Sequence, residues 1–347
     1  MTDPAERSMT EVEQEIELEE SPDEAEGSEG VETTSPARKR TRGKKRGFVS
    51  GFVSILGRPN AGKSTLLNAI VGTKVAIVAN KPQTTRTSIQ GVLTRPEGQI
   101  IFLDTPGIHK SDTRINKRMM EVVRAALVER DLLLFVADCT RPFGRNDAEA
   151  LSLVRKAETP AFLLLNKIDR MRDKRELLPL IEAYNKAFQF AEIFPISAKS
   201  GDGLEAVVSA VFRKLPKGPP YFPEDHLTDQ PERFLASELI REKALMTTEQ
   251  EVPHAVAVVI DKWEESEKLT RIYATIFVER DGQKAILIGS RGAMMKKIGT
   301  EARVDMEQVL GRKFFLDLHV KVKANWRENP AFLNSIDWRT MAGANET

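Results

Sequence analysis

An eight-residue motif near the start of the apolar part of the chain has the residues needed to hold phosphate groups. The stretch GRPNAGKS, residues 57–64, fits the pattern GxxxxGK[ST], follows the apolar run FVSIL and precedes a helical stretch, which is the context this motif requires. Its glycines let backbone N–H groups face phosphate oxygens, and the start of the helix adds its positive dipole end. We therefore expect Lys63 to reach the β- and γ-phosphates and the Ser64 hydroxyl to ligate Mg²⁺.

Two further motifs favour guanine over adenine. NKID, residues 166–169, and SAK, residues 197–199, each follow an apolar run. The Asp169 carboxylate can accept both N1–H and N2–H of guanine, and a hydrogen-bonding site rejects an unmatched analogue by roughly 10⁴-fold. We expect Asn166 to tie this loop to the phosphate loop and to the base. Lys167 should lie along the purine face, and the SAK backbone should donate to the guanine O6.

The motif DTPG, residues 104–107, completes a guanine-nucleotide site. Asp104 is expected to hold Mg²⁺ through a water, and the Gly107 N–H to sense the γ-phosphate. Four motifs in this order, each ending an apolar run, predict binding of GTP and GDP. The residues expected to contact the nucleotide are Gly57, Arg58, Pro59, Asn60, Ala61, Gly62, Lys63, Ser64, Thr65, Asp104, Thr105, Pro106, Gly107, Asn166, Lys167, Asp169, Ser197, Ala198 and Lys199.

The elements that must position these motifs alternate between strand and helix. Five short apolar runs, FVSGFVSIL, IIFLD, LLLFVAD, AFLLLN and AEIFPIS, read as buried strands because of their length and their β-branched and aromatic content. The helical stretches between them are residues 63–71, 116–129, 146–157, 174–188 and 204–215. This alternation predicts an α/β GTPase domain over residues 48–215, with a mostly parallel sheet and helices on both faces. Ligands of such sheets bind at the carboxyl ends of strands.

A second, smaller α+β domain is predicted over residues 232–330, after a proline-rich linker, residues 216–231. Its order is helix, strand, strand, helix, glycine turn, helix and strand, which is that of a type II KH domain. The turn contains a GxxG sequence that would let a single-stranded nucleic-acid backbone approach closely. The residues expected to bind RNA are Gly289, Ser290, Arg291, Gly292, Lys296 and Lys297. The alternative is a structural helix–turn–helix with solvated lysines.

The two ends of the chain have a different composition. The chain has 347 residues with 52 Lys and Arg against 51 Asp and Glu, so net charge alone excludes no partner. Residues 1–47 are acidic and then basic, and we expect them to be disordered. The basic part is either an arm that contacts RNA or anionic lipid, or a solvated linker. Residues 331–347 are expected to form a loose tail.

Cysteine content and hydropathy bear on the compartment. Cys139 is the single cysteine, so no intrachain disulfide can form, which fits a reducing cytoplasm. No apolar stretch approaches the ~18–20 residues that span a bilayer. We expect a cytoplasmic protein, with peripheral contact at the inner face of the cell membrane left open.

The chain resembles the Era family of bacterial GTPases over about residues 51–330. The resemblance rests on GRPNAGKSTLLNAIVG, PQTTR, FLDTPGIHK, FLLLNKID, PISAKSGDGL, YFPEDHLTDQPERFLASELIREK and VKVKANWRENP. It implies a GTPase that uses Mg²⁺, binds the 3′ end of 16S rRNA and acts in assembly of the 30S ribosomal subunit. We expect a monomer, because nothing in the sequence suggests an obligate oligomer. Two departures are the long extension before Phe48 and the stretch HKSDTRIN after DTPGI.

The resemblance also assigns the residues that switch and hydrolyse. The loop NKPQTTRTSIQG becomes the first switch, with Thr85 as a Mg²⁺ ligand beside Ser64 and the adjacent Thr84 as the rival. Many relatives place a glutamine after DxxG, where this chain has Ile108, which predicts slow intrinsic turnover. Asn60 resembles a residue that binds K⁺ in some relatives. The expected catalytic set is Lys63, Thr85, Asp104, Gly107 and Asn60.

Other interpretations remain open from the sequence alone. The first is a GTP-gated interaction protein at the membrane or the division machinery, anchored by the basic segment. The second is a GTPase that recruits an RNA-modifying enzyme, against which the lack of an added catalytic domain counts. Within NWREN, Trp326 and Arg327 either contact RNA or pack against the KH helices.

Overall fold

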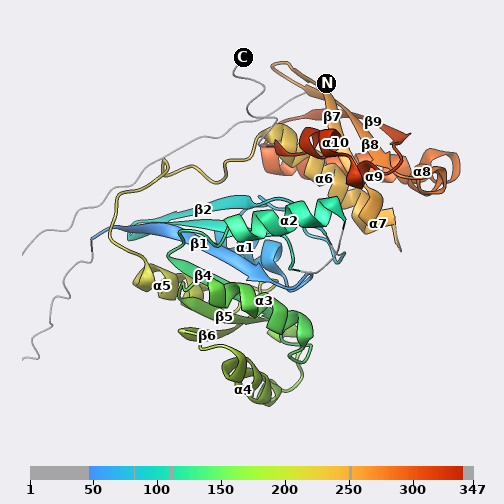
Figure 1. Cartoon of the computed structure of the whole chain (residues 1–347). Coiled ribbons are helices and arrows are strands. Elements are labelled where there is room, and N and C mark those ends of the chain that lie inside the picture. The colour runs from blue at the N-terminus through green and yellow to red at the C-terminus, as the bar shows by residue number, and fades with distance from the viewer. Residues whose placement is uncertain (1–46, 82, 109–112, 250–251, 339–347) are drawn as a thin grey trace, which may run out of the picture. The chain divides into compact units, whose positions relative to one another are not determined.

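Six strands form the sheet of the amino-terminal domain (Figure 1). The computed structural model describes residues 47–338 except 82, 109–112 and 250–251. The strands are β1 (Val49–Gly57), β2 (Ile89–Arg95), β3 (Gly98–Asp104), β4 (Leu132–Asp138), β5 (Ala161–Asn166) and β6 (Glu192–Ile196), in the order β2-β3-β1-β4-β5-β6. All pairs are parallel except β2 with β3. The mostly parallel sheet is therefore confirmed, with one antiparallel edge strand.

The two faces of this sheet are covered by different helices, because side chains alternate along each strand. Leu132, Leu134 and Val136 pack in one apolar cluster, and Leu133 and Phe135 pack in another. The first cluster includes residues of α1 and α5, and the second residues of α2, α3 and α4. The helices are α1 (Lys63–Val71), α2 (Arg114–Ala125), α3 (Arg145–Lys156), α4 (Leu177–Ala187) and α5 (Leu204–Lys214), with short 3-10 turns η1 (Ile168–Arg170) and η2 (Lys174–Glu176). Helices on both faces are as expected.

Two elements of this domain differ from the sequence prediction. Strand β2 was not expected, because IQGVLTR mixes polar and apolar residues and carries a glycine, as suits an edge strand. Helix α2 ends at Ala125 and not at Glu129, whose φ of 54° is in the left-handed region. A residue with that backbone conformation cannot continue a right-handed helix.

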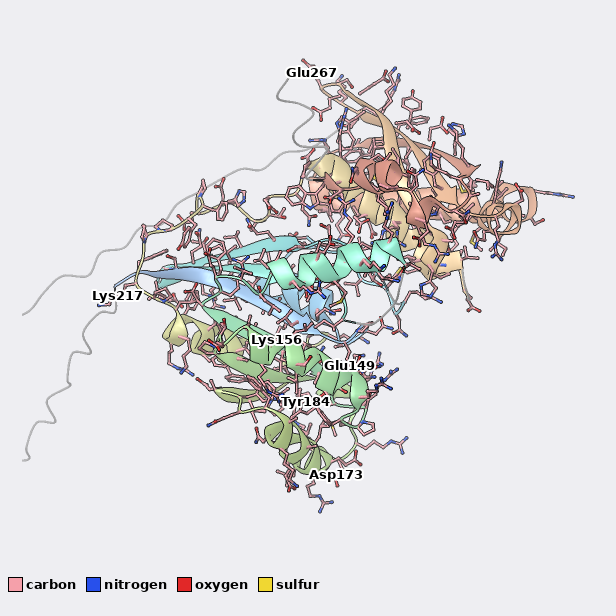
Figure 2. All side chains as sticks on the ribbon, viewed as in Figure 1. Glu149, Lys156, Asp173, Tyr184, Lys217 and Glu267 are labelled. Carbon is pink, nitrogen blue, oxygen red and sulfur yellow. The ribbon has the colours of Figure 1, made fainter. Side chains whose placement is uncertain are left out.

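A three-stranded sheet and three longer helices form the second domain. Strands β7 (Ala257–Glu265) and β8 (Thr270–Val278) are antiparallel, and β9 (Phe314–Val322) runs parallel to β8. Helices α6 (Glu232–Thr247), α8 (Asp281–Ile288) and α9 (Ala293–Leu310) pack their apolar residues with those of the sheet. The turn between β7 and β8 carries Glu267, whose side chain points outward (Figure 2). The expected order of elements around the glycine turn is confirmed.

Two expectations for this domain were wrong. The run HAVAVVIDKWEE, residues 254–265, predicts that the first strand begins at His254, but Val252–Ala255 form the short helix α7 and the strand begins at Ala257. The segment after residue 330 was expected to be loose, but Pro330–Ser335 form α10, which follows the turn η4 (Trp326–Glu328). The Asn329 side chain caps α10 by accepting from the Phe332 N–H at 3.1 Å. A six-residue helix is too short to show periodicity in sequence.

The proline-rich linker runs along the edge of the large sheet. The Val92 N–H of β2 donates to the Leu227 carbonyl at 2.9 Å, and the Thr228 hydroxyl donates to the Gln90 carbonyl at 2.7 Å. Earlier in the linker, Lys217, labelled in Figure 2, forms an isolated bridge with Val49. The linker thus covers β2, which would otherwise be an open sheet edge.

Across the described ranges, no helix combines the length and the apolar character needed to cross a membrane.

Candidate functional site

The phosphate loop connects the end of β1 to the start of α1. Three of its residues have positive φ: Gly57 at 148°, Asn60 at 63° and Gly62 at 98°. A Cβ on Gly62 would lie 2.2 Å from the Asn166 Nδ2 atom, and one on Gly107 would lie 2.7 Å from the Pro59 Cα. Only glycine fits at these two positions, because Asn166 of the NKID motif packs against Gly62, and Gly107 of the DTPG motif packs against Pro59 of the loop.

Lys63 is buried within the phosphate loop. Its ammonium donates to the carbonyls of Gly57 at 3.4 Å and Arg58 at 3.1 Å. Burial lowers the pKa of Lys63, and the charge of Asp104 opposes that shift. A cation that has been stripped of water at this position is suited to bind phosphate oxygens.

Three oxygen-bearing side chains meet beside the loop. The Ser64 hydroxyl donates to the Asp104 Oδ2 at 2.5 Å and lies 2.8 Å from the Thr85 Oγ1, which is 3.4 Å from the same Oδ2. Burial raises the pKa of Asp104 to about 6, although the charge of Lys63 and the hydrogen bonds of the Ser64 and Thr85 hydroxyls act to lower it. Among the described residues the Asp104 Oδ1 has no hydrogen-bond partner. A buried carboxylate oxygen without a partner, next to two hydroxyls, fits a hard cation such as Mg²⁺.

The two candidate switch threonines differ in their surroundings. Thr84 donates its hydroxyl to the carbonyls of Ala79 at 3.1 Å and Lys81 at 2.6 Å, within its own loop. Thr85 is buried and is the threonine that contacts Ser64 and Asp104. The geometry therefore favours Thr85 over Thr84 as the residue at the metal position.

Asn166 joins the loops at the other end of the site. Its Nδ2 donates to the Ala61 carbonyl at 2.8 Å, and its Oδ1 accepts from the N–H groups of Lys167 at 2.8 Å and Ala198 at 2.9 Å. The Asp169 Oδ1 accepts from the Ser197 hydroxyl at 2.7 Å. The phosphate loop, NKID and SAK are thus held together by hydrogen bonds, of which the sequence analysis expected only the link from Asn166 to the phosphate loop.

Two acidic residues that the sequence analysis missed support this arrangement. The Lys167 ammonium donates to the Asn60 carbonyl and to the Asp138 Oδ2, both at 2.6 Å. The lysine holds the pKa of Asp138 below its usual range, although burial acts in the opposite direction. Asp138 ends β4, so a polar residue closing an apolar run was the signal available in the sequence.

Asp147 is the second missed residue. Its Oδ2 accepts from the Arg58 Nη1 at 2.8 Å and from the Gly144 N–H at 3.0 Å, and its Oδ1 accepts from the Tyr184 hydroxyl at 2.9 Å. Tyr184 of α4 lies beside α3 (Figure 2), and burial raises its pKa. Arg58, expected at the nucleotide, therefore directs its guanidinium to α3 and anchors the phosphate loop from outside.

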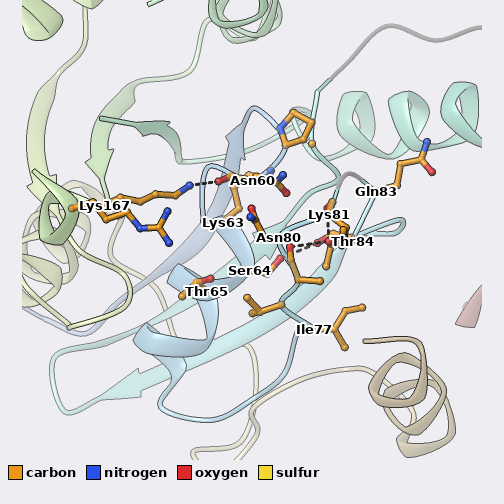
Figure 3. A pocket seen from close by; sticks show the side chains of 17 residues that line it. Asn60, Lys63, Ser64, Thr65, Ile77, Asn80, Lys81, Gln83, Thr84 and Lys167 are labelled. Carbon is orange, nitrogen blue, oxygen red and sulfur yellow. Dashed lines mark hydrogen bonds between the residues drawn. The ribbon is translucent and has the colours of Figure 1, made fainter. Parts of the chain in front are cut away.

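A cavity of about 220 Å³ opens among these residues (Figure 3). Figure 3 shows Lys167 reaching toward Asn60 across the loop, with Ser64 and Thr65 on the floor. Its lining is Pro59, Asn60, Gly62, Lys63, Ser64, Thr65, Ile77, Val78, Ala79, Asn80, Lys81, Gln83, Thr84, Thr85, Gly107, Lys167 and Arg170. Ile77, Val78, Ala79 and Arg170 were not predicted. Among predicted residues, Thr105 is buried and does not line this cavity, and its hydroxyl donates to the Ile55 carbonyl at 2.8 Å.

The GxxG turn forms η3 (Ser290–Gly292), directly before α9. Gly289 and Gly292 have φ of 71° and 77°, and Arg291 has 50°. The side chains of Arg291, Lys296 and Lys297 are exposed. Beside them is a cavity of about 300 Å³ between α9 and β9, lined by Met295, Lys296, Gly299, Thr300, Arg303, Leu316 and Leu318. Exposed cations beside an apolar groove suit a nucleic-acid backbone with its bases.

Trp326 packs inside the protein. It is fully buried, its indole N–H donates to the Ala255 carbonyl at 2.8 Å, and the Arg86 guanidinium lies 5.4 Å from its ring centroid. Arg327 pairs with Glu279 at 2.5 Å. Packing, and not RNA contact, is therefore the role of Trp326 in this conformation.

The stretch HKSDTRIN, which differs from the Era pattern, covers residues 109–116, of which 109–112 lie outside the described residues, as do the basic residues of the extension.

Comparison with known proteins agrees with this geometry. Residues 52–167 match the family model described as 50S ribosome-binding GTPase, and residues 251–327 match that of the KH domain. GTPase Era of Geobacter metallireducens is 50% identical over 293 residues, covering 84% of this chain and 98% of that protein. GTPase Era of Syntrophus aciditrophicus is 46% identical, covering 84% and 95%.

Two solved structures are similar over the same extent. One is a tyrosine-to-alanine variant of Aquifex aeolicus Era bound to GDP·AlF4⁻, with a TM-score of 0.81, 39% identity, and coverage of 84% of this chain and 99% of that one. The other is Era in complex with MgGDPNP and nucleotides 1506–1542 of 16S ribosomal RNA, with a TM-score of 0.81, 40% identity and the same coverage.

Fold and site together define a GTP-hydrolysing P-loop enzyme joined to a carboxy-terminal KH domain. Within that class, the chain is 45–50% identical to three GTPases Era over most of its length. The chain belongs to the Era family of GTPases.

Proposed function

We propose that this GTPase binds the 3′ end of 16S rRNA through its KH domain and acts as a GTP-controlled switch in assembly of the 30S subunit. The observation that carries the proposal is the GxxG turn with exposed Arg291, Lys296 and Lys297 beside the α9–β9 groove. The solved Era complex with nucleotides 1506–1542 of 16S rRNA supports this choice of RNA. We further propose a cytoplasmic, monomeric protein.

At the nucleotide, Ser64 and Thr85 would ligate Mg²⁺, and Asp104 would hold it through a water. The ion neutralises charge on the β- and γ-phosphates. Lys63 would bind the same phosphates from the loop, and the Gly107 N–H would donate to the γ-phosphate. Asp169 would select guanine, while Asn166 and Lys167 hold its loop against the phosphate loop.

Hydrolysis without help should be slow. Ile108, which follows the DxxG glycine, is buried in the apolar cluster shared with α3 and cannot orient water. We propose that K⁺ assists at Asn60, a residue of the pocket lining with φ of 63°. A cation there would add positive charge where the transition state needs it. Equal turnover in Na⁺ and K⁺ buffers would contradict this proposal.

The test of RNA binding is affinity for an oligonucleotide of the 16S rRNA 3′ end, with a non-hydrolysable GTP analogue and then with GDP. A scrambled oligonucleotide and two salt concentrations are the controls. Replacing Lys296 and Lys297 with glutamine should weaken binding and lower the salt slope by about 0.7 for each phosphate that the variant no longer neutralises. Replacement of exposed Lys186 on α4, remote from the KH domain, should change neither.

Binding that ignores both sequence and nucleotide would contradict the proposal. A membrane or partner-protein role would then be the leading alternative. It is tested by deleting residues 1–46 and measuring binding to anionic vesicles. Loss of vesicle binding on deletion would assign the basic segment as an anchor.

A further inference from the structure

A buried arginine of the KH domain reaches the switch loop of the GTPase domain. Arg241 of α6 is 2% exposed and is among the largest fully buried side chains of the described chain. Its guanidinium donates to the Gln83 carbonyl at 3.3 Å and to the Thr84 carbonyl. Glu238 holds the other edge of the guanidinium, accepting from Nε at 2.7 Å and from Nη2 at 2.6 Å. The planar donor group therefore has a fixed orientation toward two consecutive switch carbonyls.

An arginine of the switch loop also donates hydrogen bonds to the KH domain. Arg86 donates to the carbonyls of Val256 at 2.8 Å and His254 at 3.3 Å, and its guanidinium lies over the Trp326 ring. Residues 83–86 are thus fixed to the KH domain from both sides, with Thr85 between the two attachments.

The attachment of Thr84 sets the position of Thr85. The Thr84 carbonyl and the Thr85 N–H belong to one planar peptide unit, so a donor that orients the carbonyl also orients the start of Thr85. The Thr85 hydroxyl then meets Ser64 at 2.8 Å and the Asp104 Oδ2 at 3.4 Å. Through this one peptide, a side chain of the second domain acts on the metal position of the first.

The start of the switch is held by the same helix. The Glu242 Oε1 accepts from the Val78 N–H at 2.7 Å, and its Oε2 pairs with Lys74 at 2.5 Å. Lys74 also pairs at 2.7 Å with Asp305 of α9, the helix that follows the GxxG turn. Helix α6 therefore contacts the segment just before the switch loop, at Lys74 and Val78, and the loop itself, at Gln83 and Thr84.

We propose that Arg241 is a positioning residue of the GTP-bound site: helix α6 of the KH domain completes the Mg²⁺ and γ-phosphate side by holding Thr85 in place. This rests on the proposed role of Thr85 as a Mg²⁺ ligand. GDP, held by the phosphate loop, NKID and SAK, does not need this contact. Substitution of Arg241 should therefore separate the affinities for GTP and GDP.

The experiment compares Arg241→Gln with Arg241→Lys and the full chain. Equilibrium binding of a fluorescent non-hydrolysable GTP analogue and of fluorescent GDP is measured as Mg²⁺ is titrated. We expect R241Q to bind the GTP analogue about tenfold more weakly at saturating Mg²⁺, about 1.4 kcal/mol, and GDP within about twofold of the full chain. R241K should recover part of this affinity, because it keeps one charged donor. Tryptic cleavage after Arg86 should become faster in R241Q.

The matched control is Arg118→Gln. Arg118 pairs with Asp337 at 2.5 Å and donates to Asn334 at 2.9 Å, so its hydrogen bonds join α2 to the segment after the KH domain and do not involve the carbonyls that Arg241 holds. R118Q should leave the ratio of GTP-analogue to GDP affinity unchanged. If R241Q is unstable, the charge-balanced pair Arg241→Gln with Glu238→Gln replaces it, with thermal unfolding measured for each variant.

Equal weakening of GTP-analogue and GDP binding, or no weakening of either, would overturn the assignment of Arg241. Thr85→Ala separates this from the proposal beneath it. If T85A leaves the Mg²⁺ dependence of GTP-analogue binding intact, Thr85 is not the ligand and the proposed metal site fails. If T85A removes that dependence and R241Q changes nothing, only the role of Arg241 fails.

Discussion

The two ends of the nucleotide site are built in different ways. At the base end, Asn166 hydrogen-bonds to the loops around Ala61 and Ala198, so every contact lies within the GTPase domain. At the metal end, the loop that carries Thr85 is held by Arg241 and Glu242 of the KH domain. Guanine recognition is therefore independent of the second domain, whereas γ-phosphate recognition is open to its influence. Substitutions at the base end should weaken binding of GDP and GTP alike, whereas substitutions at the metal end should weaken binding of GTP more than that of GDP.

The largest effect is expected from Asp169→Asn at the base end. The amide cannot accept two hydrogen bonds from N1–H and N2–H, so we expect affinity for GDP and GTP to fall together by at least about 10³-fold. Xanthine has an oxygen where guanine has the 2-amino group, so xanthosine nucleotides should bind the variant better than guanosine nucleotides. Competition with a fluorescent nucleotide measures both. Tight binding of GTP by D169N would contradict the role of Asp169.

Asn166→Ala should give the next largest effect. It removes three hydrogen bonds and leaves the Ala61 carbonyl and the Ala198 N–H without the partner that Asn166 provides. We expect the free energy of unfolding to fall by about 2–4 kcal/mol, measured by denaturant unfolding, with equal weakening of GDP and GTP-analogue binding. A selective weakening of GTP-analogue binding would show that the two ends are coupled more closely than their contacts indicate.

Glu242→Ala tests the metal end with a smaller expected effect. It removes the acceptor of the Val78 N–H and leaves Lys74 with Asp305 alone. GTP-analogue affinity should fall about threefold to tenfold, consistent with the roughly 0.5–1.5 kcal/mol net contribution of one hydrogen bond, while GDP affinity stays the same. Glu242→Gln keeps the acceptor for Val78, so it should retain most of the GTP-analogue affinity in the same titration.

The smallest effect is expected from the exposed pair of Arg95 and Glu205. The Arg95 guanidinium donates two hydrogen bonds to the Glu205 carboxylate, at 2.6 and 2.8 Å, on the surface of the GTPase domain. Exposed pairs contribute about 0–1 kcal/mol, so Arg95→Gln should shift stability by less than about 1 kcal/mol and leave both affinities unchanged. A nucleotide-selective effect of this variant would mean that such selectivity does not report on the domain contact.

The contacts that hold the loops of the base end are easier to predict from the sequence than those that hold the switch loop at the metal end, for a physical reason. Phosphate-loop and NKID motifs are local patterns whose residue types follow from the ligand, so Lys63 and Asp169 could be assigned without a partner. Arg241 and Glu242 act on a loop more than 150 positions away, and nothing in the helix around them marks two residues as facing another domain.

The same reason explains the misses in the fold. Arg58 lies in the motif, but its partner Asp147 belongs to α3, so the motif alone suggested a nucleotide contact. Helix α10 is six residues long, and its stability comes from Phe332 and Leu333 packing with Trp326 and not from its own periodicity. Short elements that depend on tertiary contacts leave no periodic signal to detect.

The linker along β2 determines how far the KH domain can travel. Thr228 hydrogen-bonds to the sheet, and α6 begins at Glu232, so the three intervening residues span at most about 14 Å between those two points. If the contacts of α6 with the switch loop break, this short tether keeps the two surfaces at a high effective concentration, on the order of millimolar. Rebinding is then intramolecular and independent of protein concentration, so the domain contact can form and break repeatedly within one chain.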